Sequence, residues 1–206
     1  MTDEEIKNQL RFLFHEPLGD KSSEAVQATI PLIRSLEDDD FRSWYLSLAT
    51  HYLTKLGAIE EAMKLLPEIQ GYYNRAEAIL LLATKRLDKG EVYEATQLIQ
   101  NIERITKTLQ IDDEISNWQK ADVLMQTGDF YGRTGNDNLA IEDLIAADGF
   151  AQHDDASRMQ YDLVKRLIDK RVSEQAKAIA LSIGAPAYRE AAIKLFEVNE
   201  SQNDEG

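Results

Sequence analysis

A turn-forming residue followed five positions later by an alanine recurs along the chain, and this repeat constrains the fold more than any other feature. Three copies are clear and two are weaker. The clear copies are Gly57 with Ala62, Gly90 with Ala95 and Gly135 with Ala140, and the weaker ones are Asp20 with Ala25 and Arg171 with Ala176. The alanines are 37, 33, 45 and 36 residues apart, spacings typical of helical-hairpin repeats.

The chemistry of the two residue types predicts a helical hairpin in each copy. Glycine ends a helix in the left-handed conformation without the steric cost of a Cβ. An alanine early in the next helix lets two antiparallel helices approach closely. One hairpin cannot bury its apolar face alone, so hairpins stack side by side. We therefore predict an all-α protein, an α-solenoid of antiparallel helical hairpins.

Capping residues and apolar spacings of three and four residues predict about eleven helices and no strand. The predicted N-caps are Asp3, Ser22, Asp40, Asn74, Asp113, Asp137, Asp155 and Ser173. The predicted helices cover residues 3–15, 22–36, 41–56, 58–70, 74–89, 91–108, 113–134, 137–152, 156–170, 173–183 and 186–198. Residues 1–198 are predicted to form one repeat domain, and the acidic tail 199–206, which has no apolar residue, is predicted to be disordered.

The spacing of 45 residues between Ala95 and Ala140 is irregular. It exceeds the period of about 34 residues by roughly three helical turns. The extra residues fall around positions 107–120, where we expect one helix to be extended. The sequence leaves open which of the two neighbouring helices is longer.

The segment 121–153 resembles the tetratricopeptide repeat family, because its small and aromatic residues stand at that family's signature positions. These residues are Ala121, Gly128, Tyr131, Gly135, Ala140 and Ala147. The other copies match less well, and the usual proline between repeats is missing. The resemblance implies a right-handed superhelix whose first helices line a concave groove that binds proteins or peptides. The basic clamp with which some members hold acidic chaperone tails is not carried over, because only Lys165 is basic at its positions.

Composition and charge exclude several classes of function. The chain has 23 basic and 37 acidic residues and a net charge of −14, which argues against binding to nucleic acid or to an anionic membrane surface. Cysteine is absent, so thiol chemistry and thiolate metal sites are excluded. The N-terminus lacks the features of a signal peptide, and the longest apolar run, 78–83, has only six residues. These observations favour a cytoplasmic location.

The repeat frame assigns a set of side chains to the predicted groove. These are Trp44, Ser47, His51 and Lys55; Glu77, Leu80, Thr84 and Asp88; Asp122, Met125, Asp129 and Arg133; and Tyr161, Lys165 and Asp169. Trp44 and Tyr161 are exposed anchors in this frame, whereas Tyr45 and Trp118 are expected to pack between hairpins. Because the middle two repeats contribute four acidic residues and only Arg133 opposes them, we expect a basic and partly apolar partner.

No group of residues indicates catalysis, a metal or a cofactor. His15, His51 and His153 are far apart in the sequence, and no phosphate-binding loop is present. The acidic clusters 38–40, 112–114 and 154–155 are interpreted as helix caps rather than Ca²⁺ or Mg²⁺ ligands, because each precedes a predicted first helix.

The sequence therefore predicts a non-catalytic protein-interaction module, acting as an adaptor or scaffold. Two alternatives stay open. One is a hydrolase or lyase that uses groove carboxylates with a divalent metal. The other is a purely structural array that forms a homodimer through a terminal hairpin.

Overall fold

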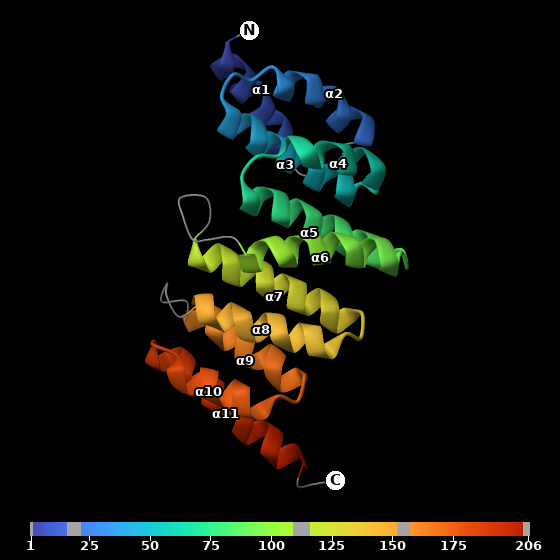
Figure 1. Cartoon of the computed structure of the whole chain (residues 1–206). Coiled ribbons are helices and arrows are strands. Elements are labelled where there is room, and N and C mark those ends of the chain that lie inside the picture. The colour runs from blue at the N-terminus through green and yellow to red at the C-terminus, as the bar shows by residue number, and fades with distance from the viewer. Residues whose placement is uncertain (1, 16–21, 109–115, 152–156, 204–206) are drawn as a thin grey trace. The chain divides into compact units, whose positions relative to one another are not determined.

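The computed structural model describes residues 2–15, 22–108, 116–151 and 157–203 (Figure 1). All regular elements in these residues are helices, which confirms the predicted all-α class. They are α1 (Asp3–His15), α2 (Ser23–Arg34), α3 (Asp39–Lys55), α4 (Ile59–Leu65) with the short 3-10 helix η2 (Leu66–Glu68), α5 (Tyr72–Asp88), α6 (Val92–Thr108), α7 (Asn117–Arg133), α8 (Asp137–Ala151), α9 (Ser157–Asp169), α10 (Ser173–Ser182) and α11 (Pro186–Asn203).

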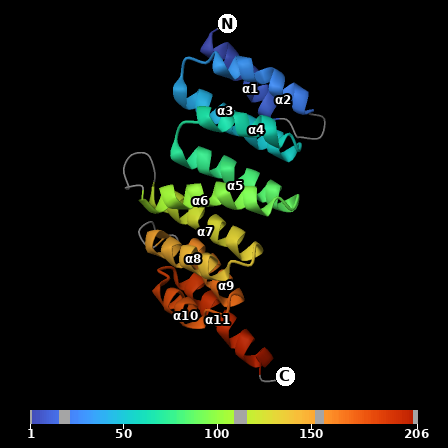
Figure 2. The same cartoon turned by 45° about the vertical axis from the view of Figure 1, so that its right-hand side comes forward.

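The chain divides into two compact units, with the boundary inside α6. The N-terminal unit is residues 1–102 and the C-terminal unit is residues 103–206. In the first, α3 packs against α2, α4 and α5; in the second, α7 packs against α8, and α9 packs against α8, α10 and α11 (Figures 1 and 2). Consecutive helices thus pair as hairpins within each unit, and the first helices α3 and α5, and likewise α9 and α11, are neighbours. That residues 1–198 act as one domain stays a prediction.

Each unit has its own apolar core. In the N-terminal unit the core is formed mainly by α1 to α5, with Leu10, Ile33, Leu53 and Leu82 fully buried. In the C-terminal unit Leu124 and Leu163 belong to a core that extends to α11. Each unit therefore holds its own first helices in place.

The helix ends confirm the role of the repeated glycines. Gly57, Gly90 and Gly135 have positive φ, and the residue after each donates its N–H to a carbonyl five positions earlier. This six-to-one hydrogen bond is the Schellman motif. Arg171 takes the same place at the end of α9, with φ of 60°.

The alanine positions are confirmed in four of the five copies. Ala62, Ala95, Ala140 and Ala176 are each the fourth residue of a second helix, and each is fully buried. The prediction is wrong for Ala25, which is exposed, because the fourth residue of α2 is Val26 and this side chain turns into the core. The first copy is therefore displaced by one residue from the predicted frame.

Several predicted N-caps lie one or more residues from the observed helix starts. Ser22 is confirmed, since its hydroxyl accepts the N–H of Ala25. The N-caps of α3, α5, α7 and α10 are instead Asp38, Gly71, Ser116 and Val172. Asp3, Asp137 and Ser173 are the first residues of their helices. Asp113 and Asp155 lie outside the described residues.

Two further expectations concern chain segments. The helix α11 extends to Asn203, within the segment 199–206 that the sequence predicts to be disordered, and the end of the ordered domain stays a prediction. The extra residues near 107–120 do not lengthen α7, because α7 has 17 residues, the same number as α3 and α5. The segment 109–115 is outside the described residues.

Candidate functional site

On α3, the predicted groove residues Trp44, His51 and Lys55 lie on one side of the helix and are partly or fully exposed. They are seven and four residues apart, which keeps them within about 40° of one another around the axis. The two flanks of this row contact the neighbouring first helices. The Tyr45 hydroxyl donates to the carbonyl of Lys7 in α1 at 3.2 Å, and the Ser47 hydroxyl donates to that of Asn74 in α5 at 3.4 Å.

The equivalent rows on the other first helices are also partly or fully exposed. Glu77, Thr84 and Asp88 form the row on α5, and Asp122, Asp129 and Arg133 form the row on α7. Lys165 and Asp169 continue it on α9. We call these four sets the first-helix rows. Within each unit the structure brings neighbouring rows together, α3 with α5 and α7 with α9.

The four predicted residues that are left lie about 60° to one side of the rows: Ser47, Leu80, Met125 and Tyr161. Each follows the first residue of its helix's row by three residues; that first residue is Trp44 on α3, Glu77 on α5, Asp122 on α7 and Arg158 on α9. Leu80 and Met125 are 4% and 6% exposed, so they are not the accessible anchors that the sequence predicts. Met125 belongs to the C-terminal core, and the Tyr161 ring lies 6.1 Å from that of Tyr188 in α11. Ser47 and Tyr161, at this position, therefore contact the next first helix of their own unit.

The sequence interpretation of the aromatic residues is half right. Tyr45 is buried, as expected, but Trp118 is 45% exposed instead of packed between hairpins. Trp118 stands one turn before Asp122, so it lies on the same side of α7 as the row. The helical spacing alone would have placed it there.

The charges of the C-terminal rows are more balanced than the sequence predicts. The Arg166 guanidinium forms an ion pair with Asp129 at 2.7 Å between Nε and Oδ1. Arg158, which occupies the first position on α9, is also exposed. Neither arginine was included in the predicted set. Arg158 follows Asp122 by 36 residues, so the repeat frame could have found it, whereas Arg166 reaches Asp129 from the flank of α9.

His51 occupies the middle of the row on α3 and is half-buried. Burial, and after it the positive charge of Lys55, lowers the pKa of this imidazole from 6.5. His51 is therefore neutral at pH 7, and no charge stands between Trp44 and Lys55 on this row.

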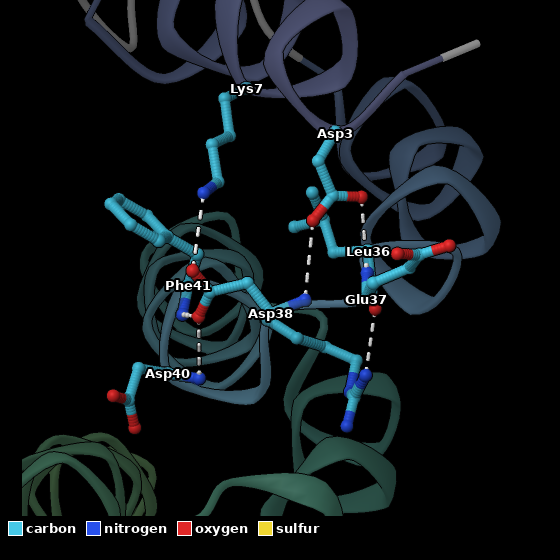
Figure 3. A network of polar contacts seen from close by, with 8 residues as sticks. Asp3, Lys7, Leu36, Glu37, Asp38, Asp40 and Phe41 are labelled. Atoms are coloured by element: carbon cyan, nitrogen blue, oxygen red, sulfur yellow. Dashed lines mark hydrogen bonds and ion pairs between the residues drawn. The ribbon is translucent and has the colours of Figure 1, made fainter.

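The acidic cluster 38–40 is built as a helix cap (Figure 3). The Asp38 carboxylate accepts the N–H groups of Asp40 and Phe41 at 3.1 and 3.2 Å, and Lys7 binds its other oxygen at 3.2 Å. The hydrogen bond from Phe41, and to a smaller extent Lys7, lowers the pKa of Asp38. Asp3 accepts the N–H groups of Glu37 and Asp38, which joins α1 to the start of α3. No three His, Asp or Glu side chains in the described part of the chain form a metal-binding group.

A buried polar group in the C-terminal unit has a structural role. The Tyr131 hydroxyl donates to Glu103 at 2.5 Å, and the Thr127 hydroxyl donates to Asp143 at 2.6 Å. Burial and the hydrogen bond to Glu103 raise the pKa of Tyr131. Tyr131, Thr127 and Asp143 are fully buried and Glu103 is half-buried, so these hydrogen bonds join α7 to α6 and to α8.

Comparisons with known proteins agree with this architecture. No protein-family model matches the chain, and no curated protein matches it. Two crystal structures of nearly identical TPR-like repeats, from a Podosopora anserina protein described as a kinesin light chain, are similar to it. A variant of that protein has a TM-score of 0.51 and 14% identity, over 93% of this chain and 94% of the other. The second structure has a TM-score of 0.49 and 14% identity, over 88% and 90% of the two chains.

This similarity shows the fold: the chain has the architecture of TPR-like helical repeats, which confirms the resemblance seen in residues 121–153. A TPR-like fold is typically a protein-interaction module and is usually non-catalytic. Among the described residues, no helix is both long and apolar enough to cross a membrane.

Proposed function

We propose that this chain is a non-catalytic protein-binding module, an adaptor or scaffold that holds a partner segment along its first-helix rows. One observation carries the proposal. Within each unit, the first helices keep the side chains of their rows in register and at least partly exposed, while the side chains three residues after the first row residue are more buried or contact a neighbouring helix. Such rows of accessible side chains on a rigid scaffold suit recognition of a partner chain.

The proposed contact residues are the members of the four rows. They are Trp44, His51 and Lys55; Glu77, Thr84 and Asp88; Asp122, Asp129 and Arg133; and Arg158, Lys165 and Asp169. Trp44 is the main anchor, because it is an exposed aromatic side chain and interface hot spots are enriched in tryptophan. The partner is a protein, and the cytoplasm is the proposed location.

Capture of partners from the native cell tests this proposal. Tagged wild-type chain is compared with Trp44→Ala and with Tyr93→Ala, which removes a 73%-exposed aromatic residue of α6 outside the rows. We expect the wild type and Tyr93→Ala to recover the same protein and Trp44→Ala to lose it. Retention of that protein by Trp44→Ala, with loss by Tyr93→Ala, would show that binding uses the second helices instead.

A further inference from the structure

The rows of the N-terminal unit differ in chemistry from those of the C-terminal unit. Leu48 on α3 follows Trp44 by four residues, and Leu81 on α5 follows Glu77 by four residues. Both leucines are half-buried. The equivalent residues on α7 and α9 are Gln126 and Asp162. A spacing of four residues keeps a side chain on the same helix face. Leu48 and Leu81 therefore add an apolar strip to the rows on α3 and α5, with Leu48 on the flank of the α3 row away from α5, whereas the equivalent positions on α7 and α9 are polar.

Trp44, which is 38% exposed, completes this apolar strip and is held in a fixed orientation. Its ring packs edge-on against that of Tyr45 at 4.8 Å, and Tyr45 is buried and bonded to α1 through its hydroxyl. An anchor that is already ordered loses little conformational entropy when a partner binds. His51 is neutral, so the strip from Trp44 to His51 presents an uncharged surface.

Opposite charges stand at the two ends of the strip on α3. Asp40, exposed, lies one turn before Trp44, and Lys55, also exposed, lies one turn after His51. Within the described residues neither side chain has an ion-pair partner. Glu77 on α5 adds a second carboxylate toward the Asp40 end, whereas Asp88 of α5, at the position equivalent to Lys55, pairs with Lys85 at 3.9 Å. The separation of fifteen residues between Asp40 and Lys55 corresponds to about 22 Å of helix, which an extended segment of about seven residues spans.

We propose that the N-terminal unit binds a short extended segment whose centre is a large aliphatic or aromatic side chain. That side chain packs on Trp44, Leu48 and Leu81. A basic side chain at one end of the segment lies near Asp40, and an acidic side chain or a chain-terminal carboxylate at the other end lies near Lys55. This inference rests on the proposed function and replaces the uniformly basic partner expected from the sequence with one that carries both charges.

Selection from a random heptapeptide phage library on the full-length chain tests it. With the wild type we expect enrichment of peptides that carry a large apolar residue between a basic and an acidic one. Lys55→Glu is expected to exchange the acidic residue for a basic one, and Trp44→Ala to remove the apolar preference. Lys64→Glu, the same charge change on an exposed residue of α4 outside the rows, is expected to select the same peptides as the wild type.

One selected peptide then gives the size of the effect. By fluorescence anisotropy we expect Trp44→Ala to weaken its binding about tenfold or more, with Tyr93→Ala unchanged and all variants showing the wild-type circular dichroism spectrum. The inference is overturned if no peptide is enriched, or if Lys55→Glu and Trp44→Ala select the wild-type peptides. If those results accompany loss of the native partner by Trp44→Ala, the proposed function stands and only the peptide chemistry is wrong.

Discussion

Arg171 is, among the described residues, the one residue with a side chain that has a left-handed backbone conformation. It stands where the other repeats have glycine, and left-handed φ costs an L-residue about 1–2 kcal/mol. We expect Arg171→Gly to raise the free energy of unfolding by about 1 kcal/mol, because part of the relief is offset by the greater freedom of glycine in the unfolded chain. Urea denaturation measures this change.

The matched control reverses the substitution at Gly90, whose φ is 81° and which has open space where a Cβ would stand. Gly90→Ala is expected to lower the free energy of unfolding by about 1 kcal/mol through backbone strain alone. A loss of stability in Arg171→Gly would show that the side chain contributes more than its backbone conformation costs.

At the scale of the helix, Asp38 rather than Asp40 starts α3. We expect Asp38→Ala to lower the urea midpoint and Asp40→Ala to change it little, because only the Asp38 carboxylate accepts N–H groups of the first turn. Since the folded-state pKa of Asp38 is lowered, its contribution is present above the ordinary value of 3.8 and is lost as the pH falls through the folded-state pKa. Equal effects of the two substitutions at pH 7 would contradict this assignment.

The choice between these aspartates shows what local sequence leaves undetermined. Any residue of the cluster 38–40 can cap a helix, so the sequence correctly places a helix start there. The choice of Asp38 depends on Lys7 and Asp3, which lie more than 30 residues away in α1. Long helices, their caps and the close-packed alanines were predictable from local pattern, whereas the register of individual caps depends on tertiary contacts.

Gly128 sets the distance between α7 and α8. A Cβ at this position would lie 3.1 Å from the carbonyl oxygen of Ala140 and 3.0 Å from Leu144 Cγ. The backbone oxygen cannot move without shifting α8, so we expect Gly128→Ala to cost about 1–2 kcal/mol despite the better helix propensity of alanine.

Gly132, in the same helix, is the control for this prediction. Its Cβ would press on the flexible end of Lys170, at 2.9 Å from Nζ, and would lie in ordinary contact with Ala140 Cβ at 4.0 Å. Gly132→Ala is therefore expected to cause no loss of stability when this variant and Gly128→Ala are compared with the wild type by thermal unfolding. If both variants unfold at the wild-type temperature, α7 and α8 are not in close contact at Gly128.

At the scale of the whole chain, the repeat frame predicts which side of each first helix is exposed but not how far a neighbouring helix covers it. Trp44, Asp129 and Lys165 are exposed as predicted, because their place follows from the spacing of the repeats. Burial of Leu80 and Met125 was not predictable, since a rotation of about 60° decides it. The balance of charge on the C-terminal rows was not predicted for a similar reason, because Arg166 lies on α9 and its ion-pair partner Asp129 lies on α7.

Net charge gives the last prediction and tests the alternative of a metal-dependent enzyme. Both units are acidic, with 17 acidic and 11 basic residues in the first and 20 and 12 in the second, so like charges repel within each. Screening of this repulsion is expected to raise the melting temperature as NaCl increases from low concentration. MgCl₂ or CaCl₂ at equal ionic strength is expected to raise it no further, because the oxygens of Asp38 are already occupied by N–H groups and Lys7.

A bound metal would behave differently in the same scan. A ligand that binds only the folded state stabilises it in proportion to the logarithm of its concentration above the dissociation constant. A rise of several degrees that begins at micromolar Ca²⁺ or Mg²⁺, and that NaCl does not reproduce, would contradict the capping interpretation. Repeating the scan with Asp38→Ala would then separate this cluster from those at 112–114 and 154–155, because a site built on Asp38 would lose the effect and a site elsewhere would keep it.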